Sequence, residues 1–135
     1  RDSVASRGLG DVYKRQLLAC STNNYLTENN TKNNRLALEP NDDGEYDIIV
    51  FDPEYETYLR SIAMPKNYYS ITFYKNKNTY YVDSWNHRHA QPHAYNPNLY
   101  AVHIDYDSNV DYGLLLEYKL YNFFRFIEWK YKVRL

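Results

Sequence analysis

The sequence contains a single cysteine, Cys20, among 135 residues, which excludes a disulfide scaffold and a zinc site of four thiolates. Lys and Arg number 16 against 17 Asp and Glu, so a formal net charge of −1 gives no electrostatic attraction to nucleic acid. No apolar run reaches the ~18–20 residues that span a bilayer. The four glycines form no phosphate-binding loop. We therefore expect one small domain with no cofactor and no nucleic-acid partner.

Aromatic residues are abundant, and 17 of them are tyrosine. The hydrophobic core must therefore be built largely from aromatic rather than aliphatic side chains. The many Asn, Tyr, Lys and Ile residues are also typical of an AT-rich genome. For that reason the tyrosine count by itself carries no functional weight in the sequence.

The first sixteen residues, RDSVASRGLGDVYKRQ, show no clear hydrophobic period. Residues 11–16 match, codon by codon, one reading frame of the transposon-end adaptor used in sequencing libraries. We interpret residues 1–16 as translated adaptor and leave them out of the fold prediction. The alternative is a genuine basic, amphipathic N-terminus.

Residues 17–20, Leu-Leu-Ala-Cys, resemble a bacterial lipobox, the end of a lipoprotein signal. In that motif apolar and small residues precede the cysteine whose thiol receives diacylglycerol, so we expect lipidation of Cys20. Residues 21–44 contain seven Asn and no core pattern, and they predict a disordered tether. Its r.m.s. reach would be roughly 25–30 Å. The alternative for Cys20 is a small buried thiol near a strand.

Residues 45–135 predict one α+β domain in which a small sheet packs against about three helices. The strands are expected near 46–51 and 99–105, and the helices near 53–63, 70–90 and 112–131. Asp52 and Pro53 form a helix start, and Met64-Pro65 forms a stop. For residues 67–90 the pattern also fits a hairpin, and we favour the helix, partly on the resemblance described next. The core positions expected on the first and last helices are Tyr55, Tyr58, Leu59, Ile62, Leu116, Leu120, Phe123, Phe124, Ile127 and Tyr131.

Three stretches of this region are distinctive together: Asp52–Leu59, Trp85-Asn86-x-Arg88 followed by Pro92, and Ile104–Asp107 continuing through Asp111–Gly113. In these stretches, residues 47–135 resemble a family of short Bacteroidetes lipoproteins of unknown function. The resemblance implies the cell envelope as compartment and supplies domain boundaries. It implies no activity.

An acidic turn and four histidines raise the question of a metal site. Asp105, Asp107, Asn109 and Asp111 have the spacing of the first ligands of a calcium loop, but the required Gly and Glu are missing. Capping of the last helix by Asp107 or Asp111 is the favoured alternative. His87, His89, His93 and His103 form no zinc motif, and a surface position is the favoured interpretation of these histidines.

A second group suggests recognition. Trp85, Asn86 and Arg88 offer contact area, a two-sided amide and a planar guanidinium fork. The favoured alternative is structural, with Trp85 in the core and Arg88 paired with an acid such as Asp83 or Asp105. Phe126 and Trp129 lie beside the core stripe of the last helix and could cover a second surface or form an exposed aromatic patch. Glu117, Arg125, Glu128 and Lys132 lie on the opposite arc.

The sequence therefore favours a lipid-anchored, non-enzymatic binding or structural module on the periplasmic face of the outer membrane. Its partners would be the membrane and an envelope protein or glycan, contacted through Trp85, Asn86, Arg88, Phe126 and Trp129. The alternative is a small periplasmic hydrolase or carbohydrate-binding domain that uses the acidic turn 105–111 and exposed aromatic residues. No Gly-x-Ser-x-Gly motif supports a serine hydrolase.

Overall fold

The computed structural model describes residues 36–40 and 45–135. Two antiparallel strands come first, β1 (Leu36–Pro40) and β2 (Tyr46–Val50). Three helices follow, α2 (Pro53–Ser61), α3 (Ile71–His89) and α4 (Leu114–Tyr131). The predicted α+β class is confirmed, because the helices pack against one another and against the sheet. Within this part of the chain, none of the helices combines the length and the apolar character that crossing a bilayer requires.

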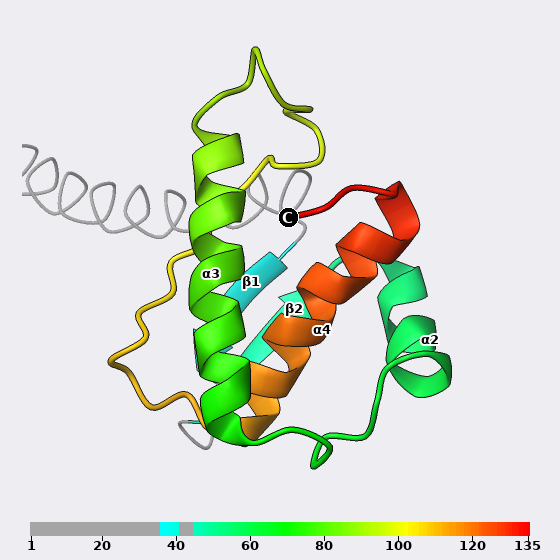
Figure 1. Cartoon of the computed structure of the whole chain (residues 1–135), viewed down its shortest axis with the longest axis vertical. Helices are drawn as coiled ribbons and strands as arrows, with labels where there is room; N and C mark the ends of the chain where they lie inside the picture. The colour runs from blue at the N-terminus through cyan, green and yellow to red at the C-terminus, as the bar shows by residue number, and fades with distance from the viewer. Residues whose placement is uncertain (1–35, 41–44) are drawn as a thin grey trace, which may run out of the picture. The chain divides into compact units, whose positions relative to one another are not determined.

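Helix α4 is the central element of residues 36–135. It packs against α3, α2 and β2, and Figure 1 shows it inclined to α3, close to it at the lower end, with α2 on its other side. Two faces of α4 are therefore buried. One carries the predicted stripe, of which only Tyr131 is partly exposed; the buried members are Leu116, Leu120, Phe123, Phe124 and Ile127. The other face places Phe126 against the rings of Tyr55 and Tyr58, with centroids 5.7 and 5.6 Å away.

Helix α2 begins as predicted. The side chain of Asp52 accepts a hydrogen bond from the Glu54 N–H at 3.1 Å, and Pro53 occupies the first turn. The helix ends at Ser61, two residues before the predicted end at 63. Tyr55 and Tyr58 are buried as predicted, whereas Ile62 is 48% exposed and its assignment to the core is wrong.

Helix α3 confirms the helix predicted over 70–90, and the hairpin alternative is wrong. Ser70 begins the helix, since its hydroxyl accepts from the Phe73 N–H at 3.2 Å. The helix turns Tyr74, Asn78 and Tyr81 into the protein together with Trp85, at the predicted steps of three and four.

The strand predicted near 99–105 is wrong, because that segment is irregular. The partner of β2 is instead β1, which lies inside the stretch 21–44 predicted to be a disordered tether. The tether prediction is therefore wrong for residues 36–40. The predicted adaptor, the lipobox with Cys20 and most of the tether lie outside the described residues.

The start of α4 differs from the capping prediction. Gly113 occupies the N-cap with a φ of 85°, and no side chain caps the helix. Glycine adopts that angle freely, whereas other residues would be strained there. Asp111 accepts from the N–H of Gly113 at 3.2 Å and Asp107 from the N–H of Asn109 at 2.9 Å. Both carboxylates thus stabilise the turn before α4, and capping of the helix by either is wrong.

Candidate functional site: a tyrosine-lined pocket

The residues predicted for recognition lie at the end of α3 and hold neighbouring backbone. Trp85 is fully buried, and its Nε1–H donates to the carbonyl of Val102 at 2.7 Å. The Asn86 amide donates to the carbonyl of Ile104 and accepts from its N–H, both at 2.9 Å. These bonds satisfy backbone groups that a strand partner would otherwise satisfy. This explains why residues 99–105 have the alternating sequence pattern of a strand but do not form one.

Arg88 joins the same structural group. Its Nη1 donates to the hydroxyl of Tyr100 at 2.8 Å, and its Nη2 donates to the carbonyl of Arg134. The guanidinium also lies 5.1 Å from the ring centroid of Tyr95. The predicted pairing of Arg88 with Asp83 or Asp105 is therefore wrong. Arg88 instead ties the C-terminal residues to α3.

The two aromatic residues expected beside the core stripe of α4 have different environments. Phe126 is fully buried between α4 and α2, so its side chain is not accessible to a partner. Trp129 is 44% exposed and packs against Tyr58, with the two ring centroids 5.5 Å apart. Of the five residues predicted to contact a partner, Trp129 therefore presents the largest exposed aromatic surface, and Trp85 and Phe126 present none.

The acidic turn and the histidines do not form a cluster. Among residues 36–40 and 45–135, no three His, Cys, Asp or Glu side chains come together in a way that could hold a metal ion. Asp107 also accepts from the Asn109 side chain at 3.0 Å. His89 Nδ1 lies 2.7 Å from the carbonyl of Tyr100, and His87 lies 2.8 Å from the Gln91 amide. These groups have local structural partners.

A polar cluster that the sequence did not predict lies between α3 and α4. Glu117, which is predicted on the arc opposite the core stripe of α4, is fully buried, as is Asn78. Asn78 Nδ2 donates to Glu117 Oε2 at 2.8 Å and to the Glu117 carbonyl at 2.9 Å. The Tyr106 hydroxyl donates to the same carboxylate at 3.1 Å.

Burial raises the pKa of the Glu117 carboxyl above its usual value. The hydrogen bonds from Asn78 and Tyr106 and the charge of Lys75 oppose that rise, whereas Asp111 adds to it. No ion pair with Glu117 occurs among the described residues. Hydrogen bonds from Asn78 Nδ2 and the Tyr106 hydroxyl satisfy the carboxylate, whereas the buried Asn78 Oδ1 has no hydrogen-bond partner among the described residues. Neither Asn78 nor Glu117 lines the pocket described next, and we interpret the cluster as structural.

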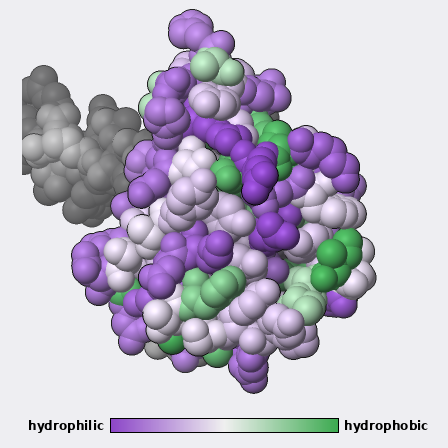
Figure 2. All heavy atoms as spheres, viewed as in Figure 1, coloured by the Kyte–Doolittle hydropathy of each residue, from purple (hydrophilic) through white to green (hydrophobic). Residues whose placement is uncertain are grey.

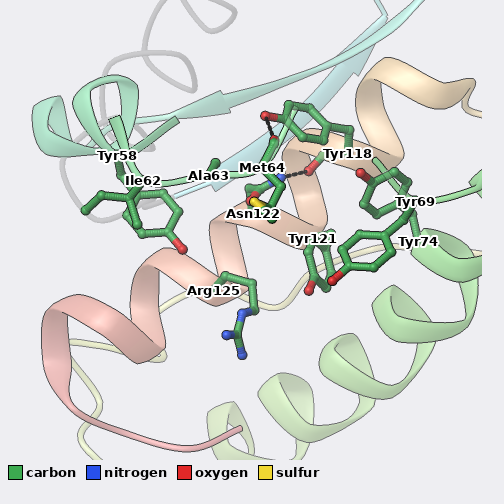
Figure 3. Close-up of a pocket in the computed structure, with 10 residues that line it drawn as sticks. All are labelled: Tyr58, Ile62, Ala63, Met64, Tyr69, Tyr74, Tyr118, Tyr121, Asn122 and Arg125. Carbon is green, nitrogen blue, oxygen red and sulfur yellow. Dashed lines mark hydrogen bonds between the residues drawn. The ribbon is translucent and has the colours of Figure 1, made fainter. Parts of the chain in front are cut away.

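A pocket of about 210 Å³ lies where α2, the connection from α2 to α3, and the helices α3 and α4 meet. Figure 3 shows Tyr58 and Ile62 on one side of it, Tyr69 and Tyr74 on the other, and Asn122 with Arg125 along α4. Half of its ten lining residues are tyrosines. The lining consists of Tyr58, Ile62, Ala63, Met64, Tyr69, Tyr74, Tyr118, Tyr121, Asn122 and Arg125.

Hydrogen bonds fix one wall of this pocket. The Tyr118 hydroxyl donates to the carbonyl of Met64 at 2.8 Å, and the Tyr74 hydroxyl donates to the carbonyl of Lys66 at 3.1 Å. Both bonds tie the connection between α2 and α3 to the helices behind it. Asn122 donates through Nδ2 to the carbonyl of Tyr118 at 2.9 Å. The pocket is therefore shaped before any ligand binds, which lowers the cost of binding.

Two other hydroxyls and a guanidinium also line the pocket. Among the described residues, no hydrogen bond is found for the hydroxyls of Tyr58 and Tyr121. In Figure 3 they point to the same side as the Arg125 guanidinium. Burial raises the pKa of Tyr121 to about 12 and also raises that of Tyr58, and the charge of Arg125 opposes both shifts. Both side chains therefore keep their O–H donors at neutral pH.

The chemistry of the pocket suits binding better than catalysis. Tyrosine rings provide apolar faces, and the hydroxyls both donate and accept hydrogen bonds. No acidic residue, histidine, serine or cysteine is among the ten lining residues, so they include neither a carboxylate pair nor an activated nucleophile. Because of these hydroxyls and rings, the pocket fits an oxygen-rich ligand.

On the face drawn in Figure 2, hydrophobic residues form separate small groups among hydrophilic ones.

None of the ten lining residues is predicted as a site residue from the sequence. They come from three helices and a connection, and only the fold brings them together. The signal that could have pointed to them was the number of tyrosines, which we set aside as a matter of genome composition.

A comparison with protein families finds that a family of unknown function, DUF6146, matches residues 13–135. The chain belongs to the DUF6146 family. The DUF6146 match reaches farther towards the N-terminus than the resemblance over 47–135, and it includes residues 13–16 of the predicted adaptor. Searches of the curated proteins and of the solved structures each found no match. DUF6146 carries no assigned activity, so function must be argued from the site.

Proposed function

We propose that this DUF6146 protein is a lipid-anchored module of a Bacteroidetes cell envelope that binds a glycan in the tyrosine pocket and catalyses no reaction. The observation that carries the proposal is the pocket lining, in which five tyrosines and one arginine surround a preformed space. Sugars present hydroxyl groups at their edges and C–H groups on their faces. Tyrosine side chains complement both kinds of surface.

The proposed location comes from the sequence. The lipobox pattern at residues 17–20 predicts attachment through Cys20, and the polar residues after it would separate the domain from the headgroups. We place the module on the periplasmic face of the outer membrane. There it would lie next to the envelope glycans that the pocket is proposed to bind.

Hydrolysis at the acidic turn 105–111 has less support. Asp107 and Asp111 accept hydrogen bonds from nearby backbone N–H groups, and they stabilise the turn before α4. None of the carboxylates of this turn is among the lining residues of the tyrosine pocket. A glycosidase needs two carboxylates on either side of one bond.

The anchor can be tested by the mass of the mature protein extracted from membranes after expression of the complete gene. We expect a chain that begins at Cys20 and carries the added mass of diacylglycerol and an acyl group. A Cys20→Ala variant should lose the lipid and leave the membrane fraction. A mature protein that keeps residues 1–16 and carries no lipid would contradict both the anchor and the adaptor interpretation.

Binding can be tested with the full, ¹⁵N-labelled chain and two probes: muramidase-released peptidoglycan fragments and polysaccharide released from lipopolysaccharide. We expect at least one probe to shift amide resonances of the pocket residues. The Tyr58→Phe/Tyr121→Phe double variant should weaken binding about tenfold, since two hydrogen bonds are lost. Tyr80→Phe is the matched control, because Tyr80 is 62% exposed and outside the pocket lining. Absence of shifts with both probes would contradict the proposal.

A further inference from the structure

The charge of the pocket is one-sided. Arg125 is the only charged side chain among the ten lining residues, and its side chain is half-exposed. Its Nη1 donates to Glu128 Oε2 at 2.9 Å. A guanidinium has five N–H groups in a planar fork, so the bond to Glu128 leaves donors for a ligand.

Glu128 also keeps the guanidinium in place. Its other oxygen, Oε1, accepts from the Leu135 N–H at 3.0 Å, so the carboxylate is held between the C-terminus and Arg125. The nearby Tyr81 hydroxyl raises the pKa of the guanidinium. The bond to Glu128 orients the arginine, and orientation before binding favours a specific ligand.

We propose that the sugar unit bound in the pocket carries a carboxylate, as a hexuronate does, and that Arg125 binds this carboxylate while the hydroxyls of Tyr58 and Tyr121 bind neighbouring sugar oxygens. This inference rests on the proposed glycan-binding function and names the ligand class for the same site. The three groups are donors at neutral pH, and they converge on one side of the pocket (Figure 3). An anion that also carries hydroxyl groups matches a guanidinium with two neighbouring hydroxyls better than a neutral sugar does.

The size of the pocket and the type of cation support this ligand class. Pockets for drug-sized ligands enclose about 300–1,000 Å³, so about 210 Å³ fits a single ring rather than a large ligand. The planar fork of arginine matches the two oxygens of a carboxylate. The lining contains no lysine, the point-charge cation that often accompanies arginine in phosphate sites.

The test uses the full ¹⁵N-labelled chain at pH 7 and three probes: glucuronate, its methyl ester and acetate. The ester keeps the sugar and removes the charge, and acetate keeps the charge and removes the sugar. We expect glucuronate to shift pocket amides with an affinity at least tenfold higher than that of the ester or of acetate. Arg125→Gln should abolish this preference for glucuronate over the ester.

Arg60→Gln serves as the matched control, since Arg60 is exposed on α2 and absent from the lining. Melting curves should show that both arginine variants remain folded at the temperature of the binding experiment. Equal affinity for glucuronate and its ester, unchanged in Arg125→Gln, would overturn the acidic ligand and leave the glycan proposal standing. Equal shifts with acetate and glucuronate would show a simple anion site and overturn the inference, as would no shift with any probe. The proposed function itself fails only if the larger envelope glycans also leave the pocket resonances unchanged.

Discussion

Replacing Trp85 with alanine will lower the free energy of unfolding by about 3–5 kcal/mol. The indole is fully buried, and its ring contacts those of Tyr100 and Phe123 with centroids 5.0 and 5.4 Å away. Truncation removes these contacts, leaves a cavity and deprives the Val102 carbonyl of its donor. Because small domains are stable by about 5–15 kcal/mol, this is a large fraction of the total.

The measurement is urea denaturation of the full chain followed by far-ultraviolet circular dichroism. Trp129→Ala is the comparison, because Trp129 is 44% exposed and its truncation should cost clearly less than that of Trp85. If Trp85→Ala costs no more than Trp129→Ala, then Trp85 does not have the central packing role described above. An exposed recognition role for the cluster would then regain support.

The second large effect concerns the buried polar cluster between α3 and α4. Asn78→Asp will destabilise the protein by more than about 3 kcal/mol at pH 7. Asn78 Nδ2 lies 2.8 Å from Glu117 Oε2, so the substitution places a second carboxylate against the first. Two buried carboxylates at this distance cannot both ionise, and the folded state must retain a proton.

The sign of the pH dependence follows from proton binding. The folded variant holds a proton at pH 7 that the unfolded chain releases, so its stability rises as the pH falls from 7 towards about 4.5. Natural Glu117 should show the same direction with a smaller amplitude, since burial raises its pKa. Glu117→Gln should lose this pH dependence, and its free energy of unfolding should stay within about 1 kcal/mol of that of the natural chain at pH 7. If the stability of the Asn78→Asp variant does not depend on pH, the buried contact between positions 78 and 117 is contradicted.

Local sequence signals were sufficient to predict the helices. Asp52-Pro53 defines the start of α2, and the aromatic steps of three and four along Tyr74, Tyr81 and Trp85 define the face of α3. These features succeed because helix capping and helical periodicity act within one or two turns. The resemblance helped to decide for α3 between a helix and a hairpin.

Strand β2 confirms the strand predicted near 46–51, but its partner could not be predicted in the same way. Residues 99–105 alternate like a strand, but their backbone partners are the side chains of Trp85 and Asn86, which only the tertiary structure supplies. Residues 36–40 lie among polar residues, and β2 provides the pairing that makes them a strand. Strand formation depends on contacts far apart in sequence, so local composition was misleading at both places.

The burial of Glu117 and the position of the pocket could not be predicted from the sequence for the same reason. Glu117 lies next to the core stripe of α4, and its burial requires Asn78 and Tyr106 from other segments to satisfy its carboxylate. The pocket requires α2, α3 and α4 to meet around Tyr58 and Tyr121. A single sequence shows each of these residues as an ordinary polar or aromatic position. Their common site appears only after the helices are placed.

We propose the tyrosine pocket as the place where this protein binds its ligand. Intermolecular nuclear Overhauser effects between the full chain and glucuronate test this directly. We expect contacts from sugar C–H protons to the ring protons of Tyr58 and Tyr121. Contacts confined to residues outside the pocket, such as the exposed indole of Trp129, would contradict it.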